Sequence, residues 1–274
     1  MIKSKLTALA SAGALLAITA PGAFAQNIGA DYNNAAAADG DEDIVAAFNL
    51  YDLAVGATLI QAAATNTGTA AAPVVGDRFT GYYQSYVTAH QLDSVVQNAP
   101  GLNTSGFGAG YEITVVAQFD EEVTSVTAGG YTSAITGGSA SMYFDTTPDF
   151  NFISDTGFTD GELLLSGNVV SGGAVSAPLL LSGFAQLDIV LNDQSSAIFN
   201  PDIATAQGIF TLDLRSNAVN GITSVGGNLA GVGDQLLGAD GNLQLQAVPV
   251  PAAAWLLGSA IAGMTMVRRR KVAA

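Results

Sequence analysis

The sequence predicts a mainly β protein: an antiparallel β-sandwich or barrel-like domain flanked by an N-terminal signal peptide and a C-terminal transmembrane helix. Short runs of aromatic and β-branched residues recur through the middle of the chain, separated by clusters of Gly, Asn, Asp and Ser. Long helical patterns do not alternate with these runs, which argues against a doubly wound fold. Each end of the chain carries an apolar run beside Lys or Arg. These features divide the chain into residues 1–25, 26–247 and 248–274.

The first segment has the three parts of a secretory signal peptide. Lys3 and Lys5 form a positive region, residues 6–20 are apolar, and a small-x-small cleavage site follows. The residues at this site are Ala23, Ala25 and Gln26. We therefore expect an exported protein whose mature chain starts at Gln26. A mitochondrial presequence is the alternative, and the lack of arginine in this segment argues against it.

The first part of the exported chain fits more than one secondary structure. Residues 43–51 match a helix with Ile44, Phe48 and Tyr51 on one face, and they match a bulged strand equally well. Residues 62–72, rich in Ala and broken by Thr, Asn and Gly, predict a loop or a sheet edge.

From Gly76 onward the pattern is plainly that of strands. Residues 79–88 are aromatic and β-branched, and residues 111–119 place alternate apolar side chains on one face. Further strands are predicted at 140–145, 161–170, 184–191, 208–214 and 242–248. Turns are predicted at the glycine pairs 129–130, 137–138, 172–173 and 226–227. Residues 216–246 either complete the sheet or act as a spacer.

Charge and cysteine content exclude several classes of function. The whole chain has a net charge of −15 and no cysteine. Without the two terminal segments, Arg78 and Arg215 stand against all 23 acidic residues, a balance of about −21. Such a surface repels nucleic acid and anionic lipid but suits cations. Disulfides, thiolate metal sites and cysteine nucleophiles are excluded.

The last segment predicts a single membrane span. Residues 248–267 are uncharged, and twenty residues of helix cover about 30 Å, the thickness of a bilayer's hydrocarbon core. A basic cluster follows, which should remain cytoplasmic and hold the chain in the inner membrane with its body outside. The cluster consists of Arg268, Arg269, Arg270 and Lys271. A buried core helix is the alternative, and the four cations argue against it.

The tail resembles the C-terminal sorting tail of PEP-CTERM proteins, in the VPLPA variant. The motif positions are held by Val248, Pro249, Val250, Pro251 and Ala252, with Val250 in place of leucine. The resemblance covers about a tenth of the chain. It implies a partner, an exosortase-type sorting enzyme, which cuts the chain near the motif. The protein would then pass from the inner membrane to the cell surface or extracellular matrix.

Few residues have the spacing that catalysis requires. His90 is the one histidine, which excludes multi-histidine zinc sites, and no Gly-x-Ser-x-Gly elbow is present. Asp120, Glu121 and Glu122 are candidates for the carboxylate pair of a glycoside hydrolase. Because they directly follow a predicted strand, solvated turn residues are the more economical interpretation.

A second acidic group suggests calcium. Five carboxylates bracket a phenylalanine-rich stretch and could supply oxygen ligands from a folded loop. They are Asp145, Asp149, Asp155, Asp160 and Glu162. The alternative is that these residues only solubilise turns beside a hydrophobic sheet.

The middle of the chain also resembles the body of flocculation-associated PEP-CTERM proteins. The resemblance rests on Gly110-Tyr111-Glu112-Ile113, on residues 140–145 and on residues 160–164. It implies a non-enzymatic role in association with extracellular polysaccharide, in biofilm or flocculation. The alternatives are a secreted carboxylate-dependent glycoside hydrolase and a purely structural exoprotein.

Overall fold

A computed structural model describes residues 27–38, 40, 44–104, 110–177, 182–193, 197–200, 206–215 and 221–247. The described strands lie in one compact unit, Ala25–Val248. The strands are β1 (Ile28–Asp31), β2 (Ile44–Phe48), β3 (Leu50–Leu53), β4 (Gly56–Ala62), β5 (Arg78–Leu92), β6 (Val95–Val96), β7 (Glu112–Thr127), β8 (Gly130–Asp145), β9 (Glu162–Ala177), β10 (Ser182–Asp193), β11 (Phe199–Asn200), β12 (Ala206–Arg215), β13 (Ser224–Val225), β14 (Asn228–Leu229) and β15 (Gln235–Ala247), with a short 3-10 helix, η1, at Tyr32–Asn34. The prediction of a mainly β, antiparallel protein is confirmed.

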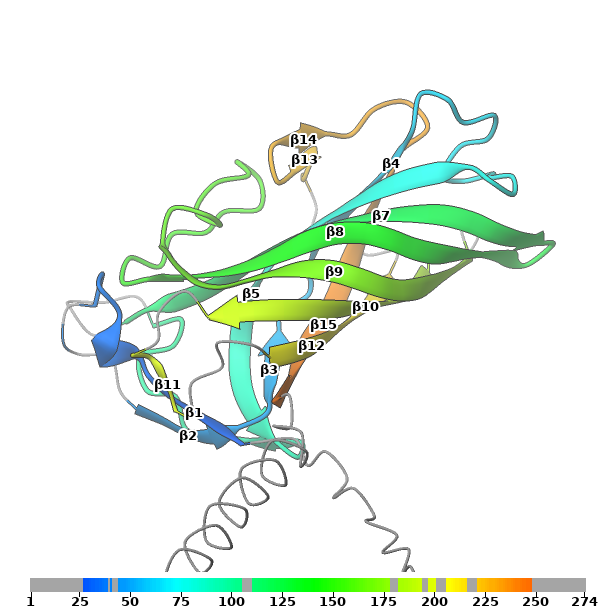
Figure 1. The fold of residues 1–274 in the computed structure, drawn as a ribbon. Helices are drawn as coiled ribbons and strands as arrows, with labels where there is room; N and C mark the ends of the chain where they lie inside the picture. Colours follow the sequence, from blue (N-terminus) through cyan, green and yellow to red (C-terminus); the bar gives the residue numbers. More distant parts are fainter. Residues whose placement is uncertain are drawn as a thin grey trace, which may run out of the picture. The chain divides into compact units, whose positions relative to one another are not determined.

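The main sheet closes on itself. It has ten strands, and its pairings run from β12 through β10, β9, β8 and β7 to β5. From β5 they continue through β3 and β4, which pair with successive parts of β5 and of β15. β15 then pairs with β12, where the path began. All these pairs are antiparallel (Figure 1).

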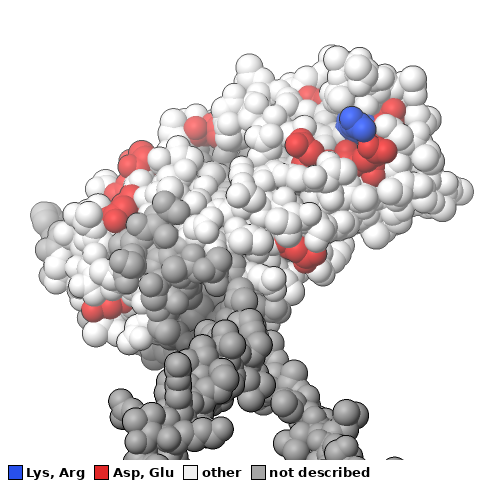
Figure 2. Space-filling view, viewed as in Figure 1, with Lys and Arg blue, Asp and Glu red and all other residues white. Residues whose placement is uncertain are grey.

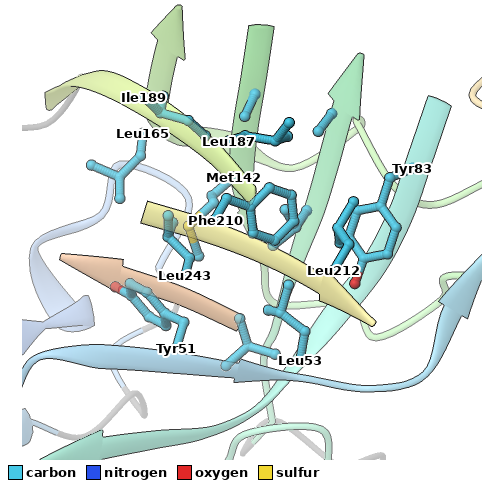
Figure 3. Close-up of a cluster of buried hydrophobic side chains, with 14 of the residues drawn as sticks. Tyr51, Leu53, Tyr83, Met142, Leu165, Leu187, Ile189, Phe210, Leu212 and Leu243 are labelled. Carbon is cyan, nitrogen blue, oxygen red and sulfur yellow. The ribbon is translucent and has the colours of Figure 1, made fainter. Parts of the chain in front are cut away.

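Alternate side chains of the closed sheet fill its interior. On β7 the side chains that point inward are those of the apolar face predicted for residues 111–119, and Ile113, Val115 and Phe119 are buried there. Figure 3 shows large apolar side chains from several strands converging on one another. The labelled residues are Tyr51, Leu53, Tyr83, Met142, Leu165, Leu187, Ile189, Phe210, Leu212 and Leu243. This shared burial is what favours closure over an open sheet.

A small sheet of β11, β1 and β2 extends the same core. Tyr32 of η1 is fully buried and stacks on Phe144 with ring centroids 5.6 Å apart. Phe48 of β2 meets the ring of Tyr51 at 5.0 Å. Residues 43–51 had matched either a helix or a strand, and the described part forms β2 and β3, separated at Asn49. Burial of both Phe48 and Tyr51 by the sheet decides for strands.

Each predicted strand from residue 79 onward is present, and several are much longer than expected. β7, β8 and β9 each have 16 residues. Two predicted turns are wrong, because Gly137–Gly138 lies inside β8 and Gly172–Gly173 inside β9. Gly138 has φ 142°, and a Cβ there would clash with the carbonyl oxygen of Gln118. Glycine therefore permits a bend next to a register shift in the β7–β8 pair.

The predicted signal peptide and C-terminal tail lie outside the described residues. Among the residues that the structure does describe, no helix has the length and apolarity needed to cross a membrane.

Candidate functional site

A groove of about 550 Å³ lies on the outer face of β5, β7 and β8. Its floor is made by side chains that point away from the core, at every second position of each strand. These floor residues are Tyr82, Gln84, Val116, Gln118, Ser139, Ser141 and Tyr143. The register places Tyr82 opposite Gln118, and Gln118 opposite Ser139. Aromatic rings, amides and hydroxyls thus lie side by side.

Two segments far apart in sequence form the walls of the groove. One is the β8–β9 loop (residues 146–161), and the other is the β13–β14 hairpin turn (Figure 1). The carboxylate of Asp155 joins them by accepting hydrogen bonds from the amides of Gly226 (3.1 Å) and Gly227 (2.8 Å). Asp155 was predicted as a calcium ligand, but the structure uses both of its oxygens to connect these walls.

Gln84 leaves one polar group unsatisfied at the groove. The residue is fully buried, and its Oε1 accepts a hydrogen bond from the amide of Gly226 at 2.8 Å. Its Nε2 has no protein acceptor. A buried donor without a partner costs about 1–3 kcal/mol, but Gln84 has no exposed surface, so an acceptor reaches its Nε2 only if the lining of the groove moves.

Aromatic packing holds the β8–β9 loop against the sheet. Phe150 stacks on Tyr86 of β5 with centroids 4.1 Å apart, and Phe158 is buried beside both Phe150 and Phe152. The hydroxyl of Thr114 donates to the carbonyl of Phe158 at 2.9 Å. The phenylalanine-rich stretch is therefore an anchor for the loop rather than an exposed surface.

The structure brings together three of the five predicted calcium ligands. One carboxylate oxygen from each of Asp145, Asp149 and Asp160 lies within 4.8 Å of the others. Glu162 points elsewhere and accepts a hydrogen bond from the amide of Ala37 at 2.9 Å. Sequence spacing placed Asp155 and Glu162 near the cluster, but contacts with distant segments take both carboxylates away.

Glu112 is a further acidic residue at this cluster, and the sequence analysis did not single it out. It begins β7, lies directly opposite Asp145 and is fully buried. Neither carboxylate oxygen accepts a hydrogen bond of acceptable geometry. Burial raises the pKa of Glu112 to about 7; the backbone amides of Asp149 and Phe150 lower it in part, and the charges of Asp149 and Asp145 add to the rise. The sequence feature that could have pointed to Glu112 is an acidic residue on the outward face of a predicted strand, next to an acid-rich loop.

The candidate catalytic residues do not converge. Glu121 points inward and is buried, with the hydroxyl of Ser133 donating to it. Asp120 is exposed and accepts a hydrogen bond from Thr80 at 2.9 Å, while Glu122 pairs with Arg78 at 2.9 Å. The three adjacent carboxylates therefore have separate partners on two faces of β7.

His90 lies inside the core. It is fully buried, and its Nε2 lies 2.7 Å from the hydroxyl of Tyr32. Phe48 and Tyr51 surround the imidazole with centroids 4.7 and 5.0 Å away. Burial lowers the pKa of His90 to about 3, so the ring stays neutral. A group enclosed in this way cannot reach a substrate.

No family model, no curated protein and no solved structure matches the chain. The geometry of the groove and of the acidic cluster is therefore the basis of the functional argument.

Proposed function

We propose that the chain is an exported bacterial surface or matrix protein whose groove binds extracellular polysaccharide without cleaving it. The observation that supports this proposal is the composition of the groove, where Tyr82 and Tyr143 lie among amide and hydroxyl side chains. Sugar rings present apolar faces to aromatic side chains and hydroxyls to polar ones. Closure of the sheet favours the barrel-like alternative of the predicted fold, with the groove on its outside.

The unpaired Nε2 of Gln84 would suit such a ligand once a movement of the groove lining exposed it. A hydroxyl or ring oxygen is an acceptor without charge, and it can satisfy a neutral amide donor. An anionic ligand is less suitable, because the carboxylate of Asp155 also lines the groove and the body of the chain is strongly acidic.

The second half of the proposal concerns where the protein is transported. The signal peptide and the Val248–Ala252 motif support export, inner-membrane anchoring with a cytoplasmic C-terminus, and cutting by an exosortase-type enzyme. Release to the cell surface or matrix would place the groove among extracellular polysaccharides. Roles in biofilm or flocculation follow from that location.

A glycoside hydrolase is the competing function. Retaining and inverting enzymes both need two carboxylates facing the sugar. Among the described residues that line the groove, Asp155 is the acidic one, and both its oxygens bind backbone amides. Glu112, with its pKa raised to about 7, has the acidity of a proton donor, but it has no exposed surface. These observations favour binding over hydrolysis.

Affinity electrophoresis in gels that contain polysaccharide tests the proposal. The double variant Tyr82→Ala/Tyr143→Ala should be retarded less, with an affinity for the polysaccharide at least about tenfold weaker, equivalent to about 1.4 kcal/mol. Phe184→Ala is the control, since Phe184 is an exposed aromatic residue on β10, outside the groove. Retardation that is equal in the wild type and the double variant would contradict a sugar-binding groove. A chain that binds no polysaccharide at all would favour a purely structural exoprotein.

The sorting half is tested separately in the host. The intact mass of the exported protein should correspond to a chain from Gln26 to a cut near Val248–Ala252. The variant Pro249→Ala/Pro251→Ala should stay in the membrane with Lys271 attached. If both proteins keep the full tail, the segment is a permanent anchor and the exosortase proposal is wrong.

A further inference from the structure

The acidic cluster beneath one end of the β8–β9 loop has the dimensions of a cation site. Oxygens of Asp145, Asp149 and Asp160 all lie within 4.8 Å of one another. Ca²⁺ binds oxygens at about 2.3–2.6 Å, so two ligands on opposite sides of one ion are about 5 Å apart. The three carboxylates can therefore contact a single ion without a large rearrangement. Asp145 already uses Oδ1 to accept the amide of Thr147 at 2.7 Å, which leaves its other oxygen for the ion.

Glu112 provides an independent sign that something is bound here. It is 0 % exposed, and neither of its carboxylate oxygens accepts a hydrogen bond of good geometry, although the backbone amides of Asp149 and Phe150 lie close enough to lower its pKa in part. It faces the same side of the sheet as Asp145, its direct cross-strand neighbour. A buried carboxylate without a well-formed hydrogen bond is unfavourable unless a cation or a proton compensates it.

No protein cation is available to do this among the described residues. Their two basic side chains are Arg78 and Arg215, and both pair elsewhere. Arg78 contacts Glu122 at 2.9 Å, and Arg215 contacts Asp213 and Asp240 at 2.8 and 3.2 Å. Figure 2 shows acidic side chains in separate patches, with basic atoms in one place on this face.

We propose that Asp145, Asp149 and Asp160 bind a Ca²⁺ ion, with Glu112 as the fourth carboxylate. All four donors are hard oxygens, which exclude soft metals. Ca²⁺ accepts six to eight oxygen ligands in variable geometry, and water can complete its coordination because Asp149 and Asp160 are exposed. Mg²⁺ fits less well, since it demands a near-ideal octahedron and retains its water.

Bound Ca²⁺ ties both ends of the β8–β9 loop to the sheet. Asp145 precedes the loop, Asp149 lies near its start, and Asp160 lies near its end, while Glu112 belongs to β7. The same loop carries Asp155, which joins the two walls of the groove. The ion therefore fixes the loop in the position that shapes the groove. This inference does not depend on which ligand the groove takes.

Isothermal titration of CaCl2 into the full chain, freed of metal with EDTA, tests the site. The wild type should bind one ion with a saturable Kd of about 10⁻⁴–10⁻³ M or tighter. Glu112→Gln and Asp149→Asn should each weaken binding by at least about tenfold. Asp120→Asn is the matched control, because Asp120 is an exposed carboxylate on the same face of β7, about 26 Å along the strand. It should keep the wild-type affinity within about twofold.

Thermal melting supplies a second readout that does not depend on binding heat. Ca²⁺ should raise the Tm of the wild type and of Asp120→Asn, and it should leave the Tm of Asp149→Asn unchanged. Asp149 is exposed on a loop, so this variant should fold even if Glu112→Gln does not.

Three results would overturn the proposal. Absence of saturable binding to the wild type would exclude the site. Equal loss in Asp120→Asn and Asp149→Asn would indicate diffuse attraction of cations to an acidic protein. Loss in Asp149→Asn with full affinity in Glu112→Gln would remove Glu112 from the coordination shell. Affinity electrophoresis of the same samples in polysaccharide gels tests the two proposals separately. The protein can bind Ca²⁺ without binding polysaccharide, and it can bind polysaccharide without binding Ca²⁺.

Discussion

Lowering the pH from about 7 to about 5 should destabilise this protein through its one histidine, His90. Burial among Tyr32, Phe48 and Tyr51 lowers the pKa of His90 from 6.5 to about 3. The unfolded chain binds a proton near pH 6.5, whereas the folded chain stays neutral. A proton that binds only the unfolded state favours unfolding. Stability is therefore complete above 6.5 and is lost as the pH falls toward 3.

The size of the effect follows from the two pKa values. Proton linkage gives a loss of about 2 kcal/mol between about pH 7 and about pH 5. That loss is a large fraction of the stability of an ordinary domain, which is about 5–15 kcal/mol. Because the 23 carboxylates also titrate in acid, the share of His90 has to be isolated by a variant. His90→Gln removes the imidazole and retains a polar group beside the hydroxyl of Tyr32.

Urea unfolding at the two pH values measures the difference. The wild type should lose about 2 kcal/mol more than His90→Gln on acidification. Losses that agree within about 0.5 kcal/mol would refute the argument, since the buried imidazole would then have an ordinary pKa. Proton NMR of the single imidazole gives the same answer directly, because a folded-state titration near pH 6.5 contradicts its burial.

Three further predictions concern the fold. Phe210→Ala should cost about 3–5 kcal/mol in urea unfolding, because Phe210 is buried and packs edge-on against Tyr83 at 5.3 Å. Gly138→Ala should destabilise by more than about 1 kcal/mol, since its Cβ would meet the carbonyl of Gln118; unchanged stability would contradict the assigned bend. Burial raises the pKa of Glu121, and the hydrogen bond from Ser133 opposes this rise in part. The folded chain therefore keeps the Glu121 proton to a higher pH than the unfolded chain does, so the stability that this proton contributes falls as the pH rises above 4.5. Glu121→Gln should remove that decline in unfolding measured between about pH 5 and about pH 8, and a parallel decline in the variant would assign it to other groups.

Strand positions were predictable because side-chain alternation is local. Residues 111–119 show apolar side chains at every second position, and this face is the one buried in β7. Strand lengths were not predictable in the same way. Glycine pairs inside β8 and β9 look like turns in the sequence, yet the sheet uses them where long strands bend.

The candidate site, too, was predictable from the sequence only in part. Acidic spacing drew attention to the segment 145–162, and three of its five predicted ligands do meet. The other two are held by partners far along the chain, as Asp155 is by Gly226 and Glu162 by Ala37. Glu112 lies between two residues of the predicted apolar face, Tyr111 and Ile113, and so falls on the opposite face of the strand. It is nevertheless fully buried, with the backbone of Asp149 and Phe150 from the β8–β9 loop next to it, and only such a long-range contact can bury a carboxylate on this face.

By itself the sequence determined the β class, the acidic and cysteine-free character of the body, and the pattern of its two ends, because these properties depend on composition and on neighbours a few residues apart. Tertiary structure decided the closure of the sheet, the enclosure of His90, the groove between the β8–β9 loop and the β13–β14 hairpin, the grouping of three aspartates, and the burial of Glu112 opposite one of them. Each of these joins segments separated by many residues. Such pairings are selected by the burial and hydrogen bonding of the whole domain, which no local pattern encodes.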